Sequence, residues 1–133
     1  MKGCCACGAV AVSLARLPEY VNFCDCALCR KAGAAWGYYM SDEVDVIGPT
    51  RAFRRTDLLD PSLDLNFCPD CGATITWTPV CKRPPERIGV NLRLFDEAEL
   101  AGIEARFPDG RNWVDDRPAA RCAPLVMGER PLP

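Results

Sequence analysis

The stretch FCPDCG at residues 67–72 contains two cysteines separated by two residues and followed by a glycine. This spacing is typical of a zinc knuckle, in which two thiolates turn onto one ion and the glycine permits the sharp turn of the backbone. Nearer the N-terminus, CACG at residues 5–8 places one residue between two cysteines. On an extended chain both of those side chains lie on one face, so they suit one metal ion better than a disulfide with each other.

A third group, CDCALC at residues 24–29, adds three cysteines and brings the total in the three groups to seven. A closed structural zinc site takes four ligands, so one such site leaves three cysteines over. Keeping the middle group intact joins the first and last groups in the closed site: Cys5, Cys7, Cys68 and Cys71. The second site then consists of Cys24, Cys26 and Cys29 and has an open fourth position, where ligand binding or chemistry takes place.

Three further cysteines lie outside these groups: Cys4, Cys81 and Cys122. Any one of them would make the second site structural if it supplied the fourth ligand, whereas each alone is an ordinary buried or free thiol. Asp25 lies between two predicted ligands on an extended segment, so we expect its side chain to point away from the metal. It is then a loop carboxylate. The alternative is that it supports the metal ligands without binding the metal itself.

Composition excludes several classes of protein. The chain has 133 residues, which suits one domain, and its formal charge of −2 argues against a nucleic-acid partner. It contains no histidine, which removes serine–histidine and cysteine–histidine catalysis and histidine-ligated zinc. The N-terminal sequence lacks the apolar stretch of a secretory signal, and no apolar run is long enough to span a membrane. We therefore expect a cytoplasmic protein, in which clustered cysteines are metal ligands more often than disulfides.

Short apolar runs bounded by turn residues predict one mainly β domain over residues 1–133, held together by metal, with short helical turns and an irregular tail at 108–133. The predicted strands are 9–14, 20–23, 35–40, 44–47, 51–56, 63–67, 73–78 and 88–94. Helical turns are expected at 28–33 and 95–100. The strands at 63–67 and 73–78 are expected to form a hairpin across the knuckle.

The three motifs together resemble the glutathione-dependent formaldehyde-activating enzyme family, which includes centromere protein V. They read C-x-C-G at 5–8, C-x-C-x-x-C-R-K-x-G at 24–33 and F-C-x-x-C-G at 67–72, and the match spans about residues 3 to 95. The resemblance implies an Mss4-like fold of zinc-stapled antiparallel β-sheets with two zinc ions, one closed and structural and one open. It places the open, catalytic site on Cys24, Cys26 and Cys29.

The resemblance also implies a reaction: a glutathione-like thiol adds to a small aldehyde, formally a carbon–sulfur lyase run in reverse. Arg30 and Lys31 follow the last ligand and are candidates to bind a carboxylate of such a thiol, against the alternative of a solvated basic pair. Trp36, Tyr38 and Tyr39 are candidates for a pocket, with at least one expected in the core. By contrast, the arginines at 51, 54 and 55 are expected on the solvated face of an edge strand.

One position departs from the family pattern, because members usually carry histidine where this sequence has Asp25. A carboxylate cannot reproduce the donor and acceptor pair of a neutral imidazole, which bears on the substrate more than on the metal. A zinc deaminase would need a histidine motif, and a thioredoxin-like enzyme would not explain seven ordered cysteines. The main alternative is a non-catalytic zinc module that binds a protein or nucleic-acid partner.

Overall fold

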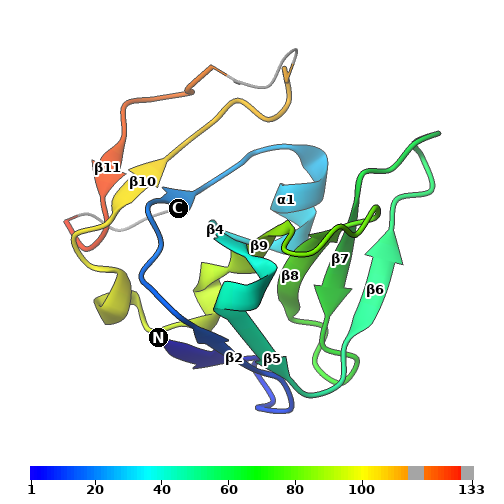
Figure 1. Ribbon diagram of the computed structural model, residues 1–133. Coiled ribbons are helices and arrows are strands. Elements are labelled where there is room, and N and C mark those ends of the chain that lie inside the picture. The colour runs from blue at the N-terminus through cyan, green and yellow to red at the C-terminus, as the bar shows by residue number, and fades with distance from the viewer. Residues whose placement is uncertain (114–118, 130–133) are drawn as a thin grey trace.

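The computed structural model describes residues 1–113 and 119–129, which form a mainly β structure with short helical segments (Figure 1). A small sheet has the strand order β1 (Lys2–Cys4), β2 (Ala11–Leu14), β5 (Val44–Ile47). The larger sheet has the order β11 (Leu125–Val126), β10 (Glu104–Arg106), β3 (Val21–Asn22), β4 (Trp36–Met40), β9 (Arg87–Asn91), β8 (Thr74–Pro79), β7 (Leu63–Phe67), β6 (Arg51–Arg54). Neighbouring strands are antiparallel except β10 and β3. The predicted fold class is therefore confirmed.

The helical segments are short and begin and end at identifiable residues. Helix α1 (Ala27–Ala32) begins after Cys26, whose sulfur accepts a hydrogen bond from the Cys29 N–H. It ends at Gly33, which adopts the left-handed conformation with φ of 62° that glycine tolerates best. Three 3-10 segments complete the set: η1 (Ser41–Glu43), η2 (Leu92–Leu94) and η3 (Glu97–Leu100).

The main core lies between the two sheets. In β2 the side chains alternate, so that Val12 and Leu14 are buried while Ala11 is exposed. They belong to the same apolar cluster as Tyr39 and Val90, which come from the central strands of the larger sheet. Because one face of each sheet is covered in this way, the opposite face of the larger sheet remains available for a site.

The predicted hairpin across the knuckle is present, with Leu65 opposite Trp77 in the β7–β8 register. The C-terminal part is more ordered than predicted, since β11 pairs with β10 and Pro108 forms a bridge with Ala120. Met127 is 5% exposed and belongs to the main core. The tail residues 114–118 and 130–133 lie outside the described residues. Among the residues that the structure describes, no helix is long and apolar enough to cross a membrane.

Gly89 of β9 lies directly beneath the indole ring of Trp77 on the neighbouring strand. A Cβ atom added at Gly89 would lie 2.0 Å from Trp77 Nε1, well inside van der Waals contact. We therefore expect Gly89→Ala to lower the free energy of unfolding by about 1–3 kcal/mol, as overpacking does. Denaturant titration measures the loss, and it should shrink in a Trp77→Leu background because the clash is gone. An equal loss in both backgrounds would contradict this origin.

Candidate metal centres and the adjoining cavity

The first and last cysteine groups meet, although they are about sixty residues apart in the sequence. Cys5 and Cys7 lie in the turn between β1 and β2, and Cys68 and Cys71 lie in the turn between β7 and β8. Their four sulfur atoms lie within 4.8 Å of one another. We call this group the closed cluster.

The closed cluster fits a tetrahedral zinc ion. Zinc–sulfur bonds of about 2.3 Å place neighbouring sulfurs about 3.8 Å apart in a tetrahedron. Cys7 Sγ lies 3.6 Å from Cys5 Sγ and 3.7 Å from Cys68 Sγ. The Val10 N–H donates to Cys5 Sγ at 3.2 Å, and the backbone N–H of Ala73 helps to lower the pKa of Cys71 to about 6. Both effects favour the thiolate, which is the form that binds metal.

The middle group forms a second cluster at the N-terminal end of α1, which we call the open cluster. The sulfurs of Cys24, Cys26 and Cys29 lie within 4.8 Å of one another, and no further Cys, His, Asp or Glu of the described residues joins them. Hydrogen bonds from the thiols of Cys24 and Cys29 lower the pKa of Cys26 to about 2. Trp36 Nε1–H donates to Cys29 Sγ at 3.3 Å. Three thiolate donors held this closely can bind a zinc ion and leave one position open.

The structure thus brings together each cysteine group that the sequence analysis joined. Cys4, Cys81 and Cys122 are exposed, and none of them belongs to either cluster. The alternative in which one of these three closes the open cluster therefore finds no support in the arrangement of the chain.

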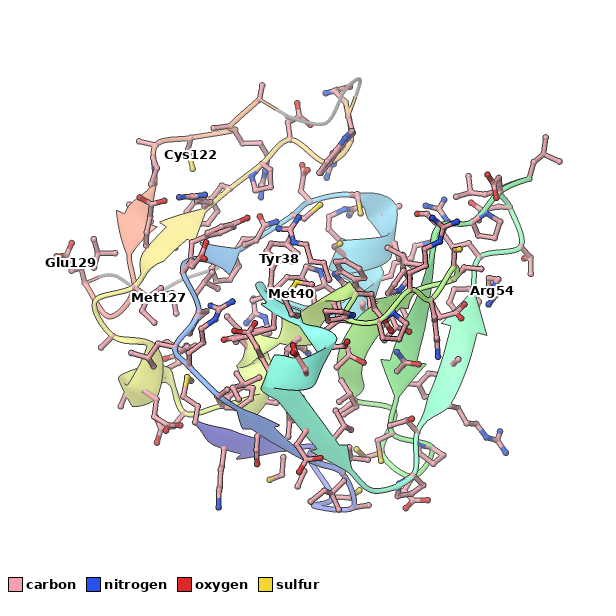
Figure 2. All side chains as sticks on the ribbon, viewed as in Figure 1. Tyr38, Met40, Arg54, Cys122, Met127 and Glu129 are labelled. Atoms are coloured by element: carbon pink, nitrogen blue, oxygen red, sulfur yellow. The ribbon has the colours of Figure 1, made fainter. Side chains whose placement is uncertain are left out.

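A cavity of about 260 Å³ adjoins the open cluster, and we call it the cysteine-side cavity. Cys24, Cys26 and Cys29 line one side of it. The other lining residues are Asn22, Leu28, Trp36, Tyr38, Arg55, Leu58, Pro61, Ser62, Leu63, Leu65, Trp77 and Trp113. Tyr38 lies near the centre of the molecule, whereas Arg54, next to Arg55, lies at the outer strand β6 (Figure 2).

The aromatic candidates divide between cavity and core. Trp36 and Tyr38 line the cysteine-side cavity, while Tyr39 is 1% exposed and belongs to the main core. Sequence reasoning missed Trp77, Trp113 and Arg55. Trp77 packs with Leu65, whereas Ile75, two residues earlier, belongs to the main core, and the β7–β8 register shifts between Asn66 and Phe67. Because residues two apart on a regular strand share a face, no sequence signal pointed to Trp77. Arg55 was expected to be solvated, yet it lines the cavity and forms an ion pair of 2.6 Å with Asp57.

The two predicted substrate-binding residues lie in helix α1. Arg30 Nε donates to the backbone oxygen of Asp25 at 3.1 Å. Neither Arg30 nor Lys31 lines the cysteine-side cavity. Arg30 thus contacts the backbone next to the open cluster, and the binding of a substrate carboxylate by Arg30 and Lys31 remains a prediction.

With this geometry established, the comparisons with known proteins identify the family. Residues 1–115 match the family model described as glutathione-dependent formaldehyde-activating enzyme. The chain belongs to this family. It is also similar to a Rhodobacter sphaeroides protein of known crystal structure, with a TM-score of 0.58 and 25% sequence identity over 77% of this chain and 97% of the other. A comparison with curated proteins found no match.

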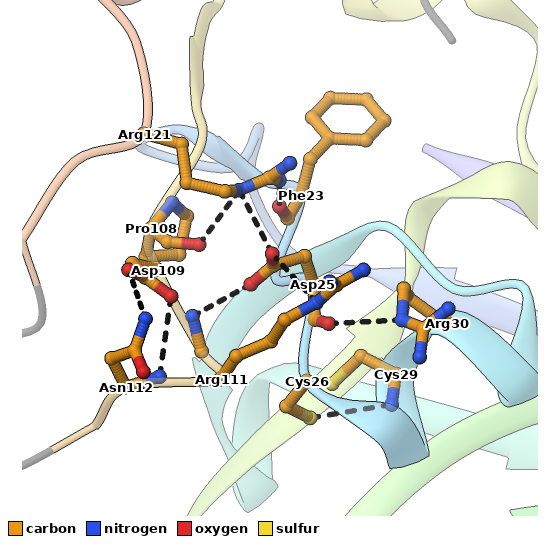
Figure 3. A network of polar contacts seen from close by, with 11 residues as sticks. Phe23, Asp25, Cys26, Cys29, Arg30, Pro108, Asp109, Arg111, Asn112 and Arg121 are labelled. Carbon is orange, nitrogen blue, oxygen red and sulfur yellow. Dashed lines mark hydrogen bonds and ion pairs between the residues drawn. The ribbon is translucent and has the colours of Figure 1, made fainter.

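Asp25 is the position at which the sequence analysis noted a departure from the family pattern, and the structure shows what this side chain contacts. Its Oδ1 accepts a hydrogen bond of 2.8 Å from Gly110 N–H, and its Oδ2 lies 3.3 Å from Arg111 and 3.6 Å from Arg121 (Figure 3). The carboxylate points away from the cysteine sulfurs, as predicted. An anion suits this place because two guanidinium groups converge on it, whereas a protonated histidine would be repelled by them.

The contacts of Asp25 hold the segment around Gly110 directly against the open cluster. A Cβ atom added at Gly110 would lie 2.4 Å from Cys24 Sγ and 2.9 Å from the Cys26 backbone nitrogen. Arg121 also donates to the Phe23 carbonyl oxygen at 2.6 Å. The tail of this chain, which the sequence predicted to be irregular, therefore packs against the predicted catalytic cysteines.

The closed cluster is expected to contribute to folding stability. Cys71→Ser removes one of its four sulfurs and should lower the zinc content by one ion per chain, with a clear fall in the melting temperature, because metal binding stabilises only the folded state. Native mass spectrometry and thermal denaturation measure these effects. Cys81→Ser is the matched control, since Cys81 is equally exposed and outside both clusters. Equal behaviour of the two variants would contradict the assignment.

The Asp25 contacts are expected to stabilise the tail by charge. Asp25→Asn keeps an acceptor for Gly110 N–H but loses both ion pairs, so the free energy of unfolding should fall by about 1 kcal/mol, limited by solvent around the two arginines. Denaturant titration at low and high salt measures it, and the difference from wild type should narrow at high salt. Asp60→Asn removes an exposed carboxylate outside this network and is the control. A loss that does not change with salt would argue against an ionic origin.

Proposed function

We propose that this protein is a zinc-dependent enzyme of the carbon–sulfur lyase type that acts on adducts of thiols and aldehydes. The reaction that we assign is the formation or cleavage of S-(hydroxymethyl)glutathione from glutathione and formaldehyde in the cytoplasm. Two zinc ions per chain are part of this proposal, one in the closed cluster and one in the open cluster. Family membership supports the reaction class.

The observation that carries the proposal is the difference between the two clusters. Four sulfurs complete the coordination of a zinc ion in the closed cluster, whereas three sulfurs in the open cluster leave one position. The open cluster also lines a cavity, so that position is accessible to a small molecule. A module whose zinc is purely structural needs neither feature.

A zinc ion in the open cluster would supply a coordination position at which an incoming thiol loses its proton at neutral pH. The protein's own groups support this by hydrogen-bonding the cysteine sulfurs. Trp36 Nε1–H contacts Cys29 Sγ, and the Cys29 N–H contacts Cys26 Sγ at 3.4 Å. These hydrogen bonds reduce the negative charge on the three thiolate sulfurs, so a fourth sulfur ligand is repelled less.

The reaction is a simple addition in which atoms and charge balance. The S–H bond of the thiol breaks, a C–S bond forms at the carbonyl carbon, and a proton moves to the carbonyl oxygen. Tyr38 lines the cavity and receives a hydrogen bond from Asn22 Nδ2–H. Burial raises the pKa of Tyr38 to about 12, so its hydroxyl keeps its proton at neutral pH and can donate to the developing oxygen.

Three cationic side chains are candidates to bind the carboxylates of the thiol. Arg55 lines the cavity itself, although Asp57 already pairs with it. Arg30 and Lys31 lie on α1 and would contact groups that extend around the helix. In this proposal the open-cluster cysteines would hold the metal ion that binds the reacting sulfur, and the cations orient the rest of the molecule.

The test is catalysis of adduct exchange together with metal content. Two-dimensional NMR exchange spectroscopy of glutathione and formaldehyde at equilibrium should show faster exchange with the zinc-loaded protein. Cys26→Ser should lose at least tenfold of that acceleration and bind one zinc ion instead of two by native mass spectrometry. Cys81→Ser should behave as wild type.

Two results would contradict the proposal. A wild-type protein that binds two zinc ions yet leaves the exchange rate unchanged has no such activity. A Cys26→Ser variant that unfolds completely would indicate a structural role for the open cluster and favour the non-catalytic module. Circular dichroism of Cys26→Ser shows whether a loss of activity in this variant comes from unfolding.

A further inference from the structure

The cysteine-side cavity meets a second cavity of different character. The second cavity has a volume of about 500 Å³ and shares Asn22, Tyr38, Trp77 and Trp113 with the first. It also contains Arg87 and Arg106, so we call it the arginine-side cavity. The two cavities therefore adjoin each other at these four residues, and we refer to the pair as the groove.

The groove divides by polarity. The walls of the cysteine-side cavity are mainly apolar and include Leu58, Leu63, Trp36 and Trp77. Among the described residues its one cationic lining residue is Arg55, which is already paired with Asp57. Moving a carboxylate or an ammonium group into such a place without a partner is costly. Glutathione carries two carboxylates and an ammonium group, so the cysteine-side cavity is a poor place for its charged ends.

The arginine-side cavity suits those charged ends. The Arg87 guanidinium lies 4.3 Å from the centre of the Tyr38 ring, and the Arg106 guanidinium lies 3.8 Å from the centre of the Tyr20 ring. Stacking on an aromatic face holds each guanidinium in place. The Arg106 guanidinium also pairs with Glu104, whereas Arg87 forms no ion pair among the described residues and keeps its N–H groups available. A peptide-like thiol can therefore extend from the open cluster toward the arginines and leave the apolar walls to its reaction partner.

The size of the cysteine-side cavity points to a partner larger than formaldehyde. A water molecule occupies about 30 Å³ in the liquid, and formaldehyde has only two heavy atoms. Either leaves most of a cavity of about 260 Å³ unfilled. A small polar ligand buries little of the apolar wall and so gains little binding free energy from it. An aromatic ring would contribute to the binding free energy both through the apolar area that it buries and through stacking on the aromatic side chains.

One buried polar atom at the junction of the two cavities lacks a partner. Asn22 is 7% exposed, and its Oδ1 has no hydrogen-bond partner in the part of the chain that the structure describes. Its Nδ2–H donates to the Tyr38 hydroxyl. That oxygen has almost no accessible surface, so a ligand reaches the Asn22–Tyr38 pair through the Tyr38 hydroxyl, which lines the cavity. Asn22 holds this hydroxyl in place, and the hydroxyl keeps its own O–H to donate to a ligand oxygen.

We infer that the cysteine-side cavity selects an aromatic or other bulky apolar aldehyde, bound as its thiol adduct with the hydroxyl group at Asn22 and Tyr38. The inference rests on the proposed function and names its substrate class. The thiol S–H bond breaks, the C–S bond forms at the aldehyde carbon, and the proton ends on the oxygen as that hydroxyl. The apolar group of the aldehyde packs against Trp36, Trp77 and Leu58.

Two adjacent leucines provide a matched pair for the test. Leu58 lines the cavity, whereas Leu59 is fully exposed and does not. The exchange rates of glutathione with phenylacetaldehyde and with formaldehyde are compared by NMR for the zinc-loaded proteins. Wild type should accelerate the phenylacetaldehyde exchange at least tenfold more than the formaldehyde exchange. Leu58→Arg should lower that ratio at least tenfold, and Leu59→Arg should leave it unchanged.

Binding of benzyl alcohol tests the cavity apart from the reaction, because this probe carries the ring and the hydroxyl group but neither sulfur nor aldehyde. Isothermal titration calorimetry should detect binding to wild type and to Leu59→Arg, with at least fivefold weaker binding to Leu58→Arg. Asn22→Leu should weaken benzyl alcohol binding while toluene binding is retained. Zinc content and circular dichroism confirm that each variant is folded.

The outcomes separate the inference from the proposed function. Acceleration of the formaldehyde exchange alone, with no benzyl alcohol binding, would overturn the inference and leave the proposed function standing. Benzyl alcohol binding without acceleration of either exchange would overturn the proposed function and support the apolar preference of the cavity. Equal effects of Leu58→Arg and Leu59→Arg would also overturn the inference.

Discussion

The mutual repulsion of thiolate sulfurs is the constraint on which the rest of the structure depends. Four cysteines whose sulfurs lie within 4.8 Å of one another cannot all be ionised unless a cation sits between them. With a zinc ion present, the same four groups connect the β1–β2 turn to the β7–β8 turn and close a loop of about sixty residues. Metal affinity then contributes directly to fold stability, which suits a small domain with short strands.

The open cluster depends on the packing around it in a way that the closed cluster does not. Its three sulfurs come from a loop and a helix of six residues, which is too short to be stable alone. The tail supplies the missing support, because Asp25 contacts Gly110, Arg111 and Arg121, and Gly110 in turn packs against Cys24 Sγ. An aspartate at this position therefore has a structural reason, which is the pair of arginines in the tail.

The sequence allowed prediction of the features that depend on local pattern. Cysteine spacing separated the seven candidate ligands into two groups, and alternation of apolar residues located β5 and β7 with their observed bounds. The strand β1 was missed because Lys2–Cys4 is short and has no apolar alternation, and it becomes a strand only by pairing with β2. The cavity was not predictable either, since Arg55, Trp77 and Trp113 come from segments whose proximity is decided by sheet order.

The charge of the open cluster connects these observations with the apolar cavity beside it. Three thiolates and one zinc ion carry a net charge of about −1. That charge repels carboxylates from the immediate surroundings, and Arg55 cannot offset it fully because Asp57 is already its partner. A neutral aldehyde experiences no such repulsion and gains from the apolar walls. The carboxylates of a thiol substrate are instead favoured in the arginine-side cavity beside Arg87, so electrostatics favours one direction in which an adduct can lie.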